Sequence, residues 1–173
     1  MKISYKISKK TVEICDIKYI KNFLRISHDY DDELIVNLLN TAIGYAEQTI
    51  GIKIIESNVT ANITNSRQLI RLRYGHITKF KSVHLVSNNN KIDITNDFGE
   101  IKYKFNEIKL DPKYINQSLL ITYVAGYNNN NIPNDIKHGI MVHITRMYEQ
   151  PENISLANEH VKEFYRPHRI IKI

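Results

Sequence analysis

The feature that most constrains the fold of this chain is the regular spacing of apolar residues from Leu34 to Ile50. Apolar side chains recur there at steps of three and four residues, which is the period of an α-helix with a buried face. They are Leu34, Ile35, Leu38, Leu39, Ala42, Ile43, Ala46 and Ile50. This stripe is wider than a coiled-coil seam, so the helix is expected to pack against more than one neighbour, within the subunit or in an adjacent copy.

Signals at both ends delimit this helix. Asp29, Asp31, Asp32 and Glu33 place negative charge at its start, where the helix dipole favours it, and Gly51 supplies a stop. We therefore predict a long helix over about residues 29–50. A shorter helix is expected before it, from an N-cap at Asp16 to near Ile26, with Tyr19, Ile20, Phe23 and Leu24 on one face.

The helical pattern returns after Pro133, which suits a first helical turn. A buried face made of Ile136, Ile140, Ile144, Met147 and Tyr148 predicts a helix over about residues 133–149, which Pro151 ends. A weaker helix is expected from about Ser155 to Tyr165, before Pro167.

Between about Lys53 and Val124 the pattern changes to short alternating or β-branched runs separated by turn residues. Ile101, Tyr103 and Phe105, for example, alternate with polar residues. Turns are expected at Asn88–Asn90 and at Asn96–Gly99, so this segment predicts hairpins in a small antiparallel sheet.

The fold class that follows is α+β, with a helical core, an inserted small antiparallel β sub-lobe and an extended C-terminal tail. At 173 residues the chain has the size of one domain. We divide it into an arm (1–10), helices (11–52), the β sub-lobe (53–127), helices (132–165) and the tail (166–173).

The sequence contains no phosphate-binding loop, dinucleotide fingerprint or zinc-binding His-Glu-x-x-His helix, and no apolar run near the roughly 20 residues that span a bilayer. Cys15 is the single cysteine, and His138 and His143 are five residues apart, on different sides of a helix. Asp97-Phe98-Gly99 is interpreted as a turn. We predict no enzymatic activity, no cofactor, no metal and no membrane partner.

The formal net charge is +6, which is compatible with contact to nucleic acid or to an acidic protein surface. Basic residues cluster in the predicted strands, and Arg71 and Arg73 alternate onto one face of a strand. The cluster is Arg67, Arg71, Arg73, Lys79 and Lys81. One hypothesis is a basic face along a DNA channel, and the other is an ordinary solvated sheet face.

Four stretches, taken in order, carry a resemblance to a known family. The first is Ile20–Ile26 followed by the acidic residues from Asp29, and the second is Ala42–Gly51, which ends in Thr-x-Gly. The third is Ile121–Tyr127, ending in Tyr-x-Ala-Gly-Tyr and followed by Ile132–Lys137, and the fourth is the aromatic and basic segment Phe164–Arg169. Their order resembles the head-to-tail connector (adaptor) family of long-tailed phages, prophages and gene transfer agents. Gly139 departs from the alanine frequent there, which is expected to weaken the helix by about 1 kcal/mol.

The resemblance implies a structural protein of the virion neck, assembled in the bacterial host cytoplasm. It implies a ring of about twelve copies beneath the portal, which extends the DNA channel and docks the next neck or tail protein. The implied partners are the portal protein, that neck or tail protein, other copies of the chain, and packaged DNA bound non-specifically. For portal binding we favour the tail, which would add as a strand to a sheet edge. Its residues are Arg166, Arg169, Ile170, Ile171, Lys172 and Ile173.

Two alternatives remain open. Within the same class, the chain would be another neck or tail-completion ring protein, which the helix-first order disfavours. From a different class, it would be a small basic nucleic-acid-binding module, which the charge favours although no recognition motif accompanies it.

Overall fold

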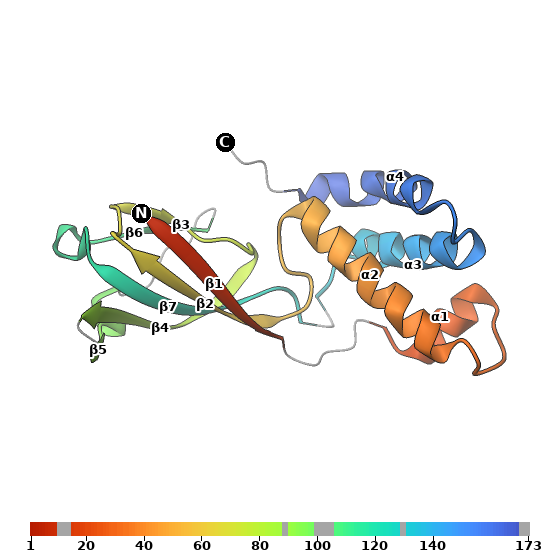
Figure 1. The fold of residues 1–173 in the computed structure, drawn as a ribbon, viewed down its shortest axis with the longest axis horizontal. Helices are drawn as coiled ribbons and strands as arrows, with labels where there is room; N and C mark the ends of the chain where they lie inside the picture. The colour runs from red at the N-terminus through yellow and green to blue at the C-terminus, as the bar shows by residue number, and fades with distance from the viewer. Residues whose placement is uncertain (10–14, 88–89, 99–105, 129–130, 170–173) are drawn as a thin grey trace. The chain divides into compact units, whose positions relative to one another are not determined.

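The structure, a computed structural model, describes residues 1–9, 15–87, 90–98, 106–128 and 131–169, which fall into two compact units (Figure 1). The sheet unit comprises Met1–Thr11 and Ile55–Tyr127, and the helical unit comprises Val12–Ile54 and Asn128–Ile173. Each unit is therefore assembled from two separate stretches of chain. That the two units behave as one domain stays a prediction.

In the helical unit, the helices are α1 (Ile17–Leu24), α2 (Asp32–Ile50), α3 (Asn134–Glu149) and α4 (Ile154–Tyr165), followed by the short 3-10 helix η3 (Arg166–His168). Asp16 caps α1, since its side chain accepts a 3.1 Å hydrogen bond from the backbone N–H of Lys18. Gly51 ends α2 in the left-handed region, with φ of +85°. The start of α1 and the end of α2 therefore agree with the cap and stop signals in the sequence.

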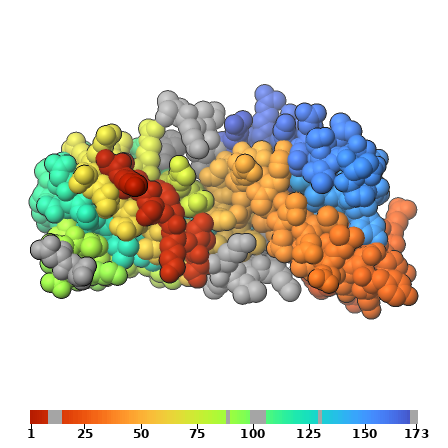
Figure 2. All heavy atoms as spheres, viewed as in Figure 1, coloured from red at the N-terminus to blue at the C-terminus, as the bar shows by residue number. Residues whose placement is uncertain are grey.

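Helix α3 contacts α2 and α4, and α2 also contacts α4. The side chains of α2 (orange) and α4 (blue) meet on the face that Figure 2 shows. The buried side chains include Ile35, Ile43, Ile136, Ile140, Ile144 and Val161. Part of the predicted apolar faces of α1 and α2 nevertheless remains exposed: Tyr19 is 58% exposed and Leu34 is 47% exposed.

The sheet unit is built on an antiparallel main sheet. Within the described residues its strand order is β1-β2-β7-β4-β5, and β3 pairs separately with β6. The strands are β1 (Lys2–Lys9), β2 (Ser57–Thr64), β3 (Leu69–Arg71), β4 (Ile77–Ser87), β5 (Asn90–Asp93), β6 (Glu107–Lys109) and β7 (Ser118–Ala125). Short 3-10 helices lie at Thr95–Phe98 (η1) and Pro112–Tyr114 (η2).

The core of the sheet unit lies between one face of the main sheet and the β3–β6 pair. Val59 of β2 and Ile121 of β7 face Ile70 of β3 and Ile108 of β6 in one buried cluster. Residues opposite each other in neighbouring strands share a face, so the pairing register shows which other side chains point toward this core. Tyr5 of β1, for instance, lies opposite Ala61 and packs against the same cluster.

The structure confirms a mixed helix and sheet fold and changes the interpretation of the amino-terminal segment. Residues expected as an arm form β1, paired along its whole length with β2. Ile3, Tyr5 and Ile7 alternate with polar residues there, but the high lysine content of the segment hid this period of two. Ile101, Tyr103 and Phe105, and the turn residues Asn88 and Asn89, lie outside the described residues.

Candidate interaction surfaces

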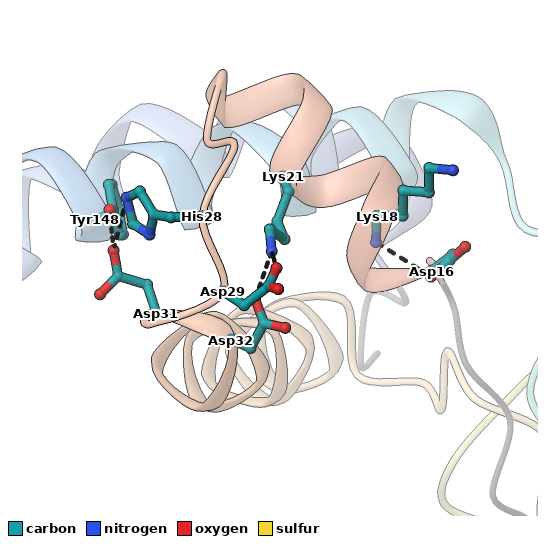
Figure 3. A network of polar contacts seen from close by, with 8 residues as sticks. All are labelled: Asp16, Lys18, Lys21, His28, Asp29, Asp31, Asp32 and Tyr148. Carbon is teal, nitrogen blue, oxygen red and sulfur yellow. Dashed lines mark hydrogen bonds and ion pairs between the residues drawn. The ribbon is translucent and has the colours of Figure 1, made fainter.

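The acidic group before α2 forms a polar junction with α1 (Figure 3). Lys21 of α1 is only 9% exposed, and its ammonium group donates hydrogen bonds to Asp29 and, at 2.8 Å, to Asp32. The bonds to these carboxylates raise the pKa of Lys21, and the bond from Lys21 lowers the pKa of Asp29. The junction fixes the orientation of α1 against the first turn of α2.

A second contact extends this junction to α3. The Tyr148 hydroxyl donates a 2.6 Å hydrogen bond to Asp31, and His28 Nε2 lies 3.8 Å from the same carboxylate (Figure 3). The bond to Asp31 raises the pKa of Tyr148. The acidic residues thus hold helices together in addition to any effect on the helix dipole. Among the described residues, no three or more His, Cys, Asp or Glu side chains are grouped so as to hold a metal ion.

Aromatic side chains join α3 to its neighbours. His138 lies edge-on to Phe23 of α1 and to Phe164 of α4, with ring centroids 6.4 and 5.2 Å apart. His143 is fully buried and lies edge-on to Tyr45 of α2, at 5.1 Å. Burial lowers the pKa of His143. The two histidines contact different neighbours, as their spacing predicts, and both belong to the packing of the helical unit.

The aromatic and basic ending of the chain is partly packed against α3. His168 Nε2 lies 2.6 Å from an Asp135 carboxylate oxygen, and this contact lowers the pKa of Asp135. Arg166 lies 3.5 Å from Glu163 and both side chains are exposed, while Arg169 is also exposed. Ile170, Ile171, Lys172 and Ile173 lie outside the described residues, so the portal-binding role of this tail stays a prediction.

The Tyr-x-Ala-Gly-Tyr stretch lies at the end of β7, and the local structure explains why it contains a glycine. Gly126 has φ of +105°, and a Cβ there would lie 2.5 Å from the carbonyl oxygen of Ile55. Only glycine allows this approach of the two backbones. Three residues before Gly126, the Tyr123 hydroxyl donates a 2.7 Å hydrogen bond to the carbonyl of Arg73 and ties β7 to the segment after β3.

The structure separates the five basic residues of the predicted DNA face. All five are exposed, but Arg71 alternates with the buried Ile70 and Leu72 and so points away from the core on the β3 side. Arg73 follows β3, and its guanidinium carbon lies 6.0 Å from the centroid of the Tyr5 ring of β1. Arg71 is paired with Glu107, and Arg67 lies in the connection before β3. Lys79 lies opposite Val124, on the face of the main sheet that points away from the same core. Lys81 lines a hollow there with Asn58 and Val124. The sequence did not reveal this division because it does not show that β3 and β4 belong to different sheets.

The described part of the chain also contains no helix that is long and apolar enough to cross a membrane. Its polar clusters consist of ion pairs and hydrogen bonds that join neighbouring elements, and its exposed side chains include charged groups of both signs and several large apolar residues. The chain belongs to the phage gp6-like head-tail connector protein family, whose sequence profile matches residues 15–168.

Solved structures with the same fold come from gene transfer agent (GTA) particles. A chain from the neck of an empty GTA particle with C6 symmetry has a TM-score of 0.76 and 12% identity, over 97% of both chains. A chain from the native GTA virion has a TM-score of 0.63 and 12% identity, over 96% of both chains. A chain from the native GTA neck with C12 symmetry has a TM-score of 0.61 and 13% identity, over 97% of both chains. Among curated proteins, no match to this sequence was found.

Proposed function

We propose that the protein is a structural head-to-tail connector subunit of a virion neck, with no catalytic role. The family match over residues 15–168 carries this proposal. It is supported by the whole-length likeness in fold to chains from GTA necks, including necks with C6 and C12 symmetry. In this proposal, copies of the chain form a closed ring beneath the portal, extend its DNA channel and dock the next neck or tail protein.

The helical unit is the part of the subunit that we assign to the ring core. Its surface carries large apolar side chains that are 42–91% exposed, and ring closure through heterologous contacts requires such surfaces. These side chains are Tyr19, Phe23, Tyr30, Leu34, Val36, Ile154 and Leu156. Tyr30, which is 91% exposed in the connection before α2, is the most accessible of them. This supports contacts to an adjacent copy near α1 and the start of α2.

For portal attachment we retain the tail from Arg166 to Ile173, which would pair as a strand with a sheet edge of the portal. His168 is held by Asp135, so the truncation that tests this role begins after residue 168 and leaves that contact intact. Deleting residues 169–173 should therefore abolish portal binding while the circular dichroism of the subunit is unchanged. Unchanged portal binding by a folded truncated subunit would exclude this role.

The connector role itself is tested by co-assembly with the portal protein encoded beside it. The purified protein and portal are mixed, and the complexes are examined by mass photometry and electron-microscope class averages. A ring stacked coaxially on the portal is the expected result. The absence of any complex under conditions where the portal is itself assembled would contradict the proposal. A ring in the isolated protein is not required, because many assembly contacts form only on a template.

A further inference from the structure

The positive charge of the protein is concentrated in the sheet unit. That unit contains 14 lysine and arginine residues against six aspartate and glutamate residues, a formal net charge of +8. The helical unit contains 10 against 12, a formal net charge of −2. The net charge of +6 therefore conceals two parts of opposite sign. A polyanion would be attracted to the sheet unit alone.

Within the sheet unit, the register of the main sheet defines an outer face, opposite the buried core. Ile3, Tyr5 and Ile7 of β1 pack on the core, so Lys2, Ser4, Lys6 and Ser8 point to the outer face. The pairing carries this face across β2, β7 and β4 to β5. Its remaining residues are Asn58, Thr60, Asn62, Thr64, Ser118, Leu120, Thr122, Val124, Lys79, Lys81, Ser82, His84, Val86, Lys91 and Asp93.

Lysines are distributed over the whole width of this outer face. Lys2 and Lys6 lie on β1, Lys79 and Lys81 on β4, and Lys91 on β5, and each of them is exposed. Neighbouring strands are about 4.8 Å apart, so the lysines are spread over roughly 19 Å. Among the outer-face residues defined above, the one carboxylate is Asp93, at the edge, where it accepts hydrogen bonds from Thr95.

The groups between the lysines include hydroxyls and amides, such as those of Thr60, Asn62 and Thr122, together with the apolar side chains of Leu120, Val124 and Val86. Lysine together with serine, threonine and asparagine is the set of side chains that contacts DNA phosphates and sugars. The aromatic rings of the main sheet, Tyr5, Phe80 and Tyr123, pack instead on the core side. Sheets that bind single strands stack bases on exposed aromatic rings. Among the outer-face residues defined above there is no Phe, Tyr or Trp, and the one ring is the half-buried imidazole of His84.

We propose that the outer face of the main sheet binds the phosphate backbone of duplex DNA without reading its sequence. Lys2, Lys6, Lys79 and Lys91 are the contacting residues, assisted by the hydroxyl and amide groups between them. Lys81 contributes less because it shares its hollow with Glu56. The proposed connector function enters only in identifying this duplex as the packaged genome. The contact excludes Arg67, which precedes β3, Arg71, which lies in β3, and Arg73, which follows it.

Two variants with the same change in charge test this assignment. The first replaces Lys2, Lys6, Lys79 and Lys91 with glutamine, and the second replaces Arg67, Arg71, Arg73 and Lys109, exposed residues outside the outer face, with glutamine. Binding of a fluorescent duplex DNA is measured between about 50 and 200 mM salt, the range in which such contacts weaken steeply. Circular dichroism and co-assembly with the portal are recorded for each protein.

The slope of log K against log salt should fall in magnitude by about 0.9 for each lost phosphate contact. We expect a decrease of about 3.6 for the outer-face variant, which loses four contacts, and a change below about 1 for the other variant. Equal decreases would mean that net charge alone matters, and a larger decrease in the second variant would place DNA on the β3 side. Either result, or no binding by the wild type at 50 mM salt, would overturn the assignment. Portal co-assembly is scored separately, so failure of the connector function remains distinguishable.

Discussion

Tyr148, near the end of α3, donates a 2.6 Å hydrogen bond to the carboxylate of Asp31, which lies 117 residues earlier at the start of α2. Asp29 and Asp32, on either side of Asp31, are bound by Lys21 of α1. Three acidic residues that the sequence assigns to the helix dipole therefore each bind a side chain from another helix. The entry into α2 is a polar junction on which the positions of α1 and α3 depend.

The Lys21 junction should make stability depend on pH at both ends of the scale. The pKa of Asp29 is lowered from its ordinary 3.8. Its contribution to the free energy of unfolding is therefore present above about pH 3.8 and is lost as the pH falls through the folded-state pKa. The pKa of Lys21 is raised from 10.5, so its contribution is complete below about pH 10.5 and is lost as the pH rises through the folded-state pKa.

Urea unfolding of the wild type and Lys21→Met between pH 2.5 and 5 measures the acidic limb. Relative to the variant, the wild type should gain stability as the pH rises through this range. Lys18→Met is the matched control, because Lys18 is an exposed lysine of the same helix and bonds to Asp16 through its backbone. Parallel pH profiles for the wild type and Lys21→Met would show that the junction does not contribute.

Gly139 is a second position where the structure alters an expectation from sequence. A Cβ on Gly139 would lie 2.8 Å from Cε1 of Tyr165 and 2.9 Å from Cβ of Phe164. Alanine gains about 1 kcal/mol in helix propensity, but overpacking a close contact costs about 1–3 kcal/mol. Gly139→Ala should therefore reduce the free energy of unfolding by about 1 kcal/mol.

Gly44, in the exposed middle of α2, is the control for this prediction, because a Cβ there would meet nothing within 4 Å. Gly44→Ala should raise the free energy of unfolding by about 1 kcal/mol. Opposite signs in urea denaturation would confirm that Gly139 is needed for the approach of α3 and α4. Stabilisation by both substitutions would mean that α4 moves without cost.

Gly126 should be less tolerant than Gly51, although both have positive φ. Alanine in the left-handed region costs about 1–2 kcal/mol at either position. At Gly126 the new Cβ also meets the backbone of Ile55, at 2.5 Å, whereas at Gly51 nothing lies within 4 Å. In urea denaturation, Gly126→Ala should lower the free energy of unfolding by about 1 kcal/mol or more beyond the loss caused by Gly51→Ala. Equal losses would show that the β7 end relaxes around the new side chain.

The sequence predicted the elements whose signals are local. The cap at Asp16, the stop at Gly51 and the three- and four-residue spacing in α2 and α3 each depend on neighbouring residues, and the structure has helices there. Strand pairing depends on residues far apart in the chain. Nothing local indicates that β1 pairs with β2, or that β2 lies beside β7.

The difference between local signals and long-range strand pairing also explains which basic residues the sequence grouped wrongly. A period of two places Arg71 and Arg73 on either side of the buried Leu72, but β3 ends at Arg71 and Arg73 lies beyond the strand. Adding Lys79 and Lys81 to that face requires knowledge of which sheet each strand joins, and β3 and β4 join different ones. Lys2 and Lys6 were missed because the segment was interpreted as an arm. Alternation with Ile3, Tyr5 and Ile7 was the available signal.

His143 gives the helical unit a pH dependence of its own near neutrality. Its side chain is fully buried beside Tyr45, and burial lowers its pKa from the ordinary 6.5. The unfolded chain then binds a proton more readily than the folded one, so the stability contributed by the neutral ring is complete above about pH 6.5. It is lost as the pH falls through the lower folded-state pKa. His143→Leu should remove this component, so that between pH 7 and 5 the variant loses less unfolding free energy than the wild type.

The control is His160→Leu, at an exposed histidine of α4, which should keep the wild-type change of unfolding free energy over the same pH range. If His143→Leu and the wild type lose stability equally over this range, the buried ring is not the group that titrates.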